Sequence, residues 1–123
     1  MHLGAFSISL NVKDIAASVA FYEALGFERS HDMADQGWMI LRQGDTVLGL
    51  YAGHVERNTL TFNPGWNQSA QPVDQFTDVR DIQKALKSKG IKIETQVDEA
   101  GSGPGHMVVV DPDGNPVLID QHV

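Results

Sequence analysis

This sequence lacks several features that would assign it to a specialised class of protein. It contains no cysteine among its 123 residues, which excludes disulfide frameworks and thiolate metal sites. No apolar run approaches the roughly 20 residues that span a bilayer. The segment from Met1 to Gly4 lacks the basic region of a secretory signal. We therefore expect a soluble, cytoplasmic protein.

Basic residues are also scarce. The chain has 9 Lys and Arg residues against 16 Asp and Glu residues, which gives a formal net charge of -7. Binding to phosphate backbones requires clustered Lys and Arg, so nucleic acid is not an expected partner. An acidic surface is compatible with a cationic ligand, although it serves solubility equally well.

The first half of the chain has clear periodicity. Alternating apolar and polar residues predict a strand over Ala5 to Val12, with a small polar face made by Ser7, Ser9 and Asn11. Asp14 can cap a helix that runs from about Ile15 to Leu25, whose apolar stripe is Ile15, Val19, Tyr22 and Leu25. Three further strands are predicted at Phe27 to Met33, Trp38 to Arg42, and Thr46 to Tyr51.

The second half repeats this order less clearly. A long segment from Gly53 to Pro72 lacks periodicity, and Thr59 to Phe62 is a candidate short strand within it. A strand is predicted at Val73 to Val79, followed by a helix that Asp81 caps and Lys89-Gly90 closes. Strands then follow at Ile91 to Val97, Met107 to Val110 and Val117 to Asp120. The Gly-rich segment from Asp98 to Gly105 is interpreted as a mobile flap.

An internal repeat relates the two halves. Val12-Lys13-Asp14-Ile15 recurs as Val79-Arg80-Asp81-Ile82, and in each half a strand and a helix precede three strands. This order predicts an α+β fold of two βαβββ modules, with mixed sheets curled around a cleft and the helices outside. We treat residues 1–123 as a single domain, with module one at about 1–56, module two at about 70–123, and 57–69 connecting them.

The same residues resemble the vicinal oxygen chelate superfamily, which contains glyoxalase I, extradiol dioxygenases and bleomycin-resistance proteins. The matching segments are the two repeated tetrapeptides, Phe21-Tyr22, Leu25-Gly26-Phe27, and Asp111-Pro112-Asp113-Gly114-Asn115. The resemblance implies paired βαβββ modules and a homodimer. It leaves the function open, because the superfamily includes lyases, isomerases, dioxygenases and proteins that only bind a ligand.

The resemblance also implies where a divalent metal would bind. Its four ligand positions, one on each of four strands that face the cleft, fall on Ser7, Gly49, Asp74 and Leu118. Only Asp74 is a good ligand, and a catalytic metal usually needs three protein ligands. We therefore predict no metal residue and no cofactor.

The predicted cleft nevertheless has the groups of a small-molecule site. Ser7, Ser9, Asn11, Asp74 and Asp120 are expected on one side of the sheet, near Trp38 and Tyr51. His106 and Trp66 are further candidate ligand contacts. The alternative is that this face is exposed to solvent and binds no ligand, or that a dimer partner covers it. Asp74 is the candidate general base, if burial makes its carboxylate more basic.

Two functions therefore remain open. The first is a superfamily member with a degenerate metal site that binds a small organic ligand, in resistance or sequestration. The second is a glyoxalase-like lyase or isomerase with a reduced or metal-free site. Whether the protein is an enzyme is not decided by the sequence.

Overall fold

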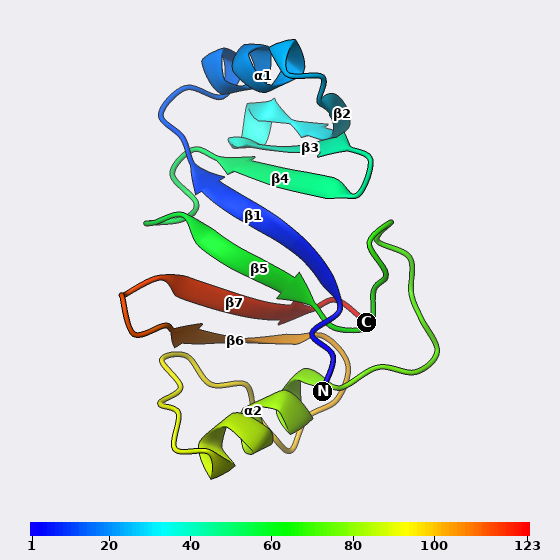
Figure 1. Cartoon of the computed structure of the whole chain (residues 1–123), viewed down its shortest axis with the longest axis vertical. Helices are drawn as coiled ribbons and strands as arrows, with labels where there is room; N and C mark the ends of the chain where they lie inside the picture. Colours follow the sequence, from blue (N-terminus) through cyan, green and yellow to red (C-terminus); the bar gives the residue numbers. More distant parts are fainter. The chain divides into compact units, whose positions relative to one another are not determined.

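The chain folds into seven β-strands, two α-helices and one short 3-10 helix, and a computed structural model describes residues 1–123 (Figure 1). It divides into two compact units. We call Ser7–Thr59 the N-terminal unit, and Met1–Phe6 together with Leu60–Val123 the C-terminal unit. The predicted α+β class is confirmed. Neither α-helix is long and apolar enough to cross a membrane.

The N-terminal unit follows the predicted order closely. Its elements are β1 (Ala5–Asn11, of which Ser7–Asn11 lies in this unit), α1 (Ile15–Ala24), β2 (Glu28–Met33), the 3-10 helix η1 (Ala34–Gln36), β3 (Trp38–Gln43) and β4 (Thr46–Tyr51). β1 pairs in parallel with β4, β4 pairs antiparallel with β3, and β3 pairs antiparallel with β2. This is one βαβββ module.

The core of the N-terminal unit lies between α1 and its sheet. Asp14 caps α1 by accepting a hydrogen bond from the Ala17 backbone N–H, as predicted. The helix then places Val19 against buried side chains of β3 and β4, with Ile15 and Tyr22 partly buried beside it. Leu25, predicted on the same stripe, is instead the C-cap residue and is 58% exposed, because the helix ends before it can turn inward.

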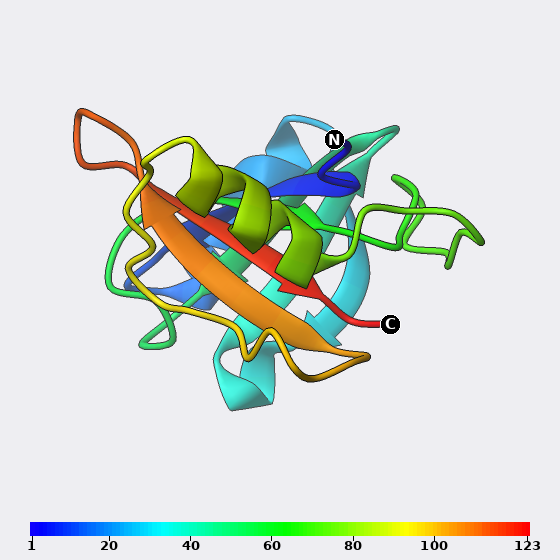
Figure 2. The same ribbon diagram turned by 90° about the horizontal axis from the view of Figure 1, so that it is seen from below.

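The C-terminal unit has the same topology, except that its second strand is reduced to a single bridge. Its elements are β5 (Thr59–Asn63), α2 (Val79–Ser88), β6 (Gly105–Val110) and β7 (Pro116–Gln121). β5 pairs in parallel with β7, and β7 pairs antiparallel with β6. Figure 2 shows α2 lying across β7 and β6, where Val79, Ile82, Met107 and Ile119 form the buried core.

Two predicted features at the start of α2 are wrong. No strand forms over Val73 to Val79, and the helix is capped by Asp78, whose side chain accepts from the Arg80 backbone N–H, instead of by Asp81. The earlier start places both Val79 and Ile82 in the core at 0% exposure, which a helix beginning after Asp81 would not do. The strand that pairs with β7 is therefore β5, within the predicted connection.

The predicted strand at Ile91 to Val97 is reduced to one bridge, between Thr95 and Val108. At Val97, the backbone N–H and carbonyl form hydrogen bonds with a side chain and not with a neighbouring strand. The buried Gln83 amide accepts from the Val97 N–H (2.8 Å) and donates to the Val97 carbonyl (3.0 Å).

The Gly-rich segment after Val97 is anchored, which contradicts its interpretation as a mobile flap. Arg80 is only 7% exposed and donates to the backbone carbonyls of Asp98, Gly103 and Pro104. The Gln121 amide donates to the Gly103 carbonyl as well. Side chains from α2 and β7 therefore fix the path of this loop.

Candidate functional site

The face of the N-terminal sheet opposite α1 carries five of the predicted site residues. Because Ile8 and Leu10 pack toward α1, strand alternation places Ser7, Ser9 and Asn11 on the opposite face. The register then aligns Asn11 with Tyr51, and Tyr51 with Trp38, in one row across three strands. The structure thus brings these residues to one surface, and their role in binding stays a prediction.

Aromatic rings form a wall on this face. Trp38 and Tyr51 are stacked, with ring centroids 6.5 Å apart and an interplanar angle of 17°. His54 meets Tyr51 edge-on at 6.4 Å, and its Nε2 lies 2.6 Å from the Gln36 carbonyl oxygen. His54 was not predicted as a site residue. It follows β4, the last strand of the first module, where no periodicity indicates the direction of its side chain.

Gly49 explains the position of the Tyr51 ring. A Cβ atom built on Gly49 would lie 2.6 Å from Cε2 and 3.0 Å from the hydroxyl of Tyr51. The ring therefore covers the space that any side chain at position 49 would occupy. In register, Gly49 lies opposite the buried Ser9 of β1.

A second polar face lies in the C-terminal unit, on the side of its sheet opposite α2. Ile119 packs toward α2, so Leu118 and Asp120 point to the other side. His106 is the cross-strand partner of Asp120, and the Asn63 amide donates to the Asp120 backbone carbonyl at 2.9 Å. Of the predicted residues, His106 and Asp120 therefore share this face.

Trp66 and His122 complete the C-terminal face. Their rings are stacked with centroids 4.5 Å apart and an interplanar angle of 7°, and His122 Nε2 lies 3.1 Å from the Asp120 carboxylate. The hydrogen bond to Asp120 raises the pKa of His122, partial burial opposes the shift, and the Asp120 charge adds to it. His122 was not predicted, because it stands beyond the last strand.

Hydrogen bonds to Phe6 of β1 and within the loop fix the loop that carries Trp66. The Gln68 amide donates to the Phe6 carbonyl at 2.6 Å and accepts from the Phe6 N–H at 2.8 Å. The Val73 N–H donates to the Gly65 carbonyl, and Trp66 forms a bridge with Pro72. Trp66 is consequently presented from a fixed support.

Asp74, the predicted general base, belongs to the C-terminal unit. It sits in an exposed bend and not on a strand. Pairing registers also revise its equivalence to Ser7: Ser9 lies opposite Gly49, Thr61 lies opposite Leu118, and so Thr59 takes the place that corresponds to Ser7. No group of three or more His, Asp or Glu side chains in residues 1–123 is arranged to hold a metal ion.

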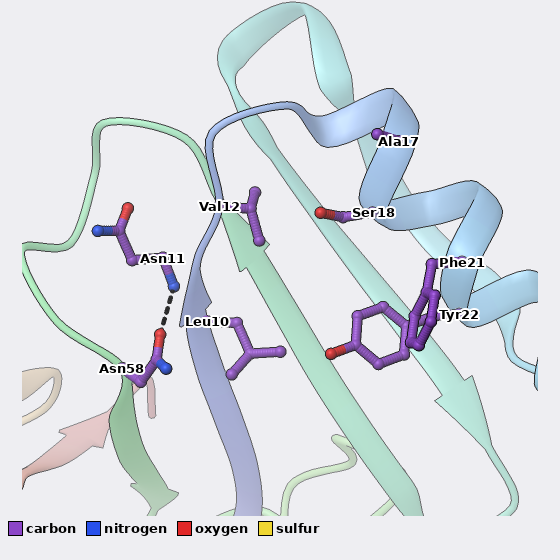
Figure 3. Close-up of a pocket in the computed structure, with 8 residues that line it drawn as sticks. All are labelled: Leu10, Asn11, Val12, Ala17, Ser18, Phe21, Tyr22 and Asn58. Carbon is purple, nitrogen blue, oxygen red and sulfur yellow. Dashed lines mark hydrogen bonds between the residues drawn. The ribbon is translucent and has the colours of Figure 1, made fainter.

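A groove that the sequence did not predict lies on the helix side of the N-terminal unit. It has a volume of about 370 Å³ and is lined by residues of α1, β1 and Asn58 (Figure 3). The Phe21 and Tyr22 rings project from α1 on the side of Leu10 of β1 and of Val12, which follows β1. The Asn58 side chain accepts from the Asn11 N–H at 2.9 Å. Phe21 is 61% exposed, so this groove is open to solvent.

The sequence matches the family model described as Glyoxalase/Bleomycin resistance protein/Dioxygenase superfamily over residues 4–119. None of the proteins of curated function matches the sequence.

Solved structures share the fold at low sequence identity. A Legionella pneumophila protein named as an NAD-dependent benzaldehyde dehydrogenase is 21% identical, with a TM-score of 0.70 over 96% of this chain and 99% of that chain. A glyoxalase/bleomycin resistance protein/dioxygenase superfamily member from Vibrio splendidus 12B01 is 16% identical, with a TM-score of 0.65 over 94% and 97%. A hypothetical protein from Bacillus halodurans C-125 is 13% identical, with a TM-score of 0.62 over 99% and 94%.

Proposed function

The chain belongs to the glyoxalase/bleomycin resistance protein/dioxygenase superfamily, and on that premise we propose that it binds a small planar organic molecule, in a resistance or sequestration role. The binding surface is the face of the N-terminal sheet that carries Trp38 and Tyr51. The superfamily's metal site is degenerate in this chain.

The observation that carries the proposal is the Tyr51 ring over Gly49. This strand position would present a metal ligand in the metal-binding members that the sequence resembles. Here it has no side chain, and the aromatic ring of Tyr51 occupies the space above it. Leu118 also offers no donor atom, and hydroxyl groups at Ser7 and Thr59 do not replace His or Glu as metal ligands. These donors do not fit a catalytic divalent metal.

The properties of the face indicate the chemistry of the ligand. Stacked aromatic rings offer a flat apolar surface with negative π-faces, and a net charge of -7 attracts cations. The exposed Asn11 supplies a polar side chain on the same face. A planar cationic compound, such as an antibiotic of the bleomycin type, suits this combination.

The two tryptophans make the proposal testable, because one lies in each unit. Bleomycin and a panel of planar aromatic cations would be titrated into the variants Trp66→Phe and Trp38→Phe while tryptophan fluorescence is followed. In Trp66→Phe, the remaining Trp38 should be quenched on binding. In Trp38→Phe, which replaces the indole by a smaller ring, affinity measured by isothermal titration calorimetry should fall about 5-fold, corresponding to a loss of roughly 1 kcal/mol of aromatic contact.

Two results would contradict the proposal. One is quenching of Trp66 alone with unchanged affinity in Trp38→Phe, which would move the ligand away from this face. The other is stoichiometric metal in the purified protein, with thermal stabilisation by Ni²⁺, Zn²⁺, Mn²⁺ or Fe²⁺. The homodimer that the resemblance implies is part of the same proposal, and sedimentation equilibrium would measure its mass.

The alternative is a glyoxalase-like lyase or isomerase that works without a metal. One observation favours it, since such reactions move protons and the His122–Asp120 pair is arranged for proton transfer. The exposed Asp74 lacks the burial that its predicted role as a base required.

A further inference from the structure

The C-terminal face contains a histidine that two neighbours hold in one orientation. The Asp120 carboxylate fixes the Nε2 edge of His122 at 3.1 Å, and the Trp66 ring supports one face of the imidazole at 4.5 Å. A base whose ring is oriented by a carboxylate is the arrangement found in nucleophile–base–orienter sites. This chain has no Ser or Cys nucleophile in contact with the imidazole, so a proton is what the ring is placed to accept.

The hydrogen bond to Asp120 determines which ring nitrogen is available. A carboxylate only accepts, so in neutral His122 the proton resides on Nε2 and the lone pair on Nδ1. Nδ1 forms no hydrogen bond in the structure, and 46% of the side chain is exposed. Nδ1 is therefore the ring nitrogen left to accept a proton, on a side chain that is about half exposed.

The groups around His122 favour the cationic state after proton transfer. Asp120 supplies a negative charge, and Trp66 supplies a π-face on which an imidazolium is stabilised. His106, the cross-strand partner of Asp120 on β6, is the other titratable side chain on this face. Formation of the imidazolium thus leaves an ion pair in place and no isolated charge.

We propose that His122 is a proton acceptor toward a small planar carbon acid bound on the C-terminal face, with Asp120 as its orienting residue and Trp66 as its support. In the step, Nδ1 takes a proton from a C–H bond of the ligand, and the electron pair of that bond moves into the ligand. The imidazolium then returns the proton to the product or to water. This role requires neither a metal nor the Trp38–Tyr51 face.

5-Nitrobenzisoxazole is a suitable probe for this step. Removal of its C3 proton turns the C–H electron pair into the third bond of a nitrile, the N–O bond breaks, and the oxygen leaves as a coloured phenolate. The wild-type protein should accelerate this reaction, and His122→Gln should reduce the rate about 100-fold, which is the low end for a positioned base. His2→Gln, at an exposed histidine that lies on no strand or helix, is the matched control and should retain the wild-type rate.

The pH profile separates a proton acceptor from a structural histidine. The rate should rise with pH as His122 loses its proton. In Asp120→Asn, the midpoint should move to lower pH, because the carboxylate that raises the His122 pKa is gone. Nitrogen-detected NMR of the wild-type imidazole would follow the same titration without substitution at His122.

The proposal is overturned if His122→Gln, shown to be folded by circular dichroism, keeps the wild-type rate and pH profile. It is equally overturned if NMR places the lone pair of neutral His122 on Nε2. Quenching of Trp38 by planar cations is measured in the other unit, so failure of the proposed binding function and failure of this inference give different results.

Discussion

Because Gly49 has no side chain, the Tyr51 ring occupies the space above this position of β4. Replacing its hydrogen by a methyl group forces the Tyr51 ring away, since the built Cβ lies 2.6 Å from Cε2. The clash is with the far end of a side chain, so the ring moves and the backbone stays. A methyl group added at position 49 is therefore expected to displace Tyr51 from its stack with Trp38.

We expect Gly49→Ala to fold and to lose the stack between Trp38 and Tyr51, at a cost of about 1 kcal/mol in unfolding free energy. In a Trp66→Phe background, the near-ultraviolet circular dichroism and fluorescence of Trp38 should change. Gly101→Ala is the matched control, because its Cβ would meet its nearest atom, the Asp98 carbonyl oxygen, at an ordinary 3.4 Å. An unchanged Trp38 signal in Gly49→Ala would show that the ring does not depend on this glycine.

Individual site residues were predictable where strand alternation applies. Ser7, Ser9 and Asn11 lie on one face because the pattern of β1 requires it, and Trp38 and Tyr51 follow from the same rule on β3 and β4. His54, His122 and the contacts of Trp66 lie past strand ends. Their positions depend on contacts with residues distant in sequence, which no local pattern encodes.

At the scale of elements, the first turn of α2 is held by several side-chain hydrogen bonds and an ion pair. Asp78 caps the helix, pairs with Arg80 at 3.1 Å, and accepts from the Gln121 amide at 3.0 Å. Gln121 in turn accepts from the Val79 N–H at 2.8 Å. The start of α2 is thus fixed to the end of β7 and to the Gly-rich loop.

Asp78→Asn should lower the unfolding free energy at neutral pH by about 2 kcal/mol, because Arg80 is buried and loses its charged partner. Burial alone raises the Asp78 pKa, but hydrogen bonds from Gln121 and Arg80 and the Arg80 charge lower it overall. A lowered folded pKa means that the stabilisation is complete above the ordinary Asp value of about 3.9. It is lost as pH falls through the lower folded value.

Urea denaturation at pH 7 and in acid would measure this effect, and the difference between wild type and Asp78→Asn should shrink in acid. Asp14→Asn is the control at the equivalent cap of α1. Asn and Asp cap helices about equally, and Asp14 has no ion pair, so little change is expected. A pH-independent difference for Asp78→Asn would rule out the ionised carboxylate as its cause.

The elements of the N-terminal unit were predicted to within about two residues, because each strand alternates and α1 has a clear cap. In the C-terminal unit the repeat was misleading. Val79-Arg80-Asp81-Ile82 looks like Val12-Lys13-Asp14-Ile15, but the true cap precedes Val79. The absence of a second strand at Ile91 to Val97 was not predictable, because side chains of Gln83 and Arg80 bind the backbone carbonyls of Val97 and Asp98 in its place.

At the scale of the whole molecule, the proposed binding function predicts that the net charge of -7 favours cationic over neutral ligands. Affinity for a planar cation should fall several-fold between about 0.01 M and 1 M salt, over which the Debye length shrinks from roughly 30 to 3 Å. A neutral planar compound of similar size should bind equally at both salt concentrations. Fluorescence titrations in Trp66→Phe would measure both. Equal salt dependence for the two compounds would exclude charge as a source of selectivity.

The anchoring of the Gly-rich loop also bears on how this protein can evolve. Arg80 holds the loop through the main-chain oxygens of Asp98, Gly103 and Pro104, none of which depends on side-chain identity. Ala100 and Ser102 are exposed between those anchor points. The loop can therefore accumulate or be given new side chains at these positions while keeping its path, which makes it a natural place to diversify the sequence.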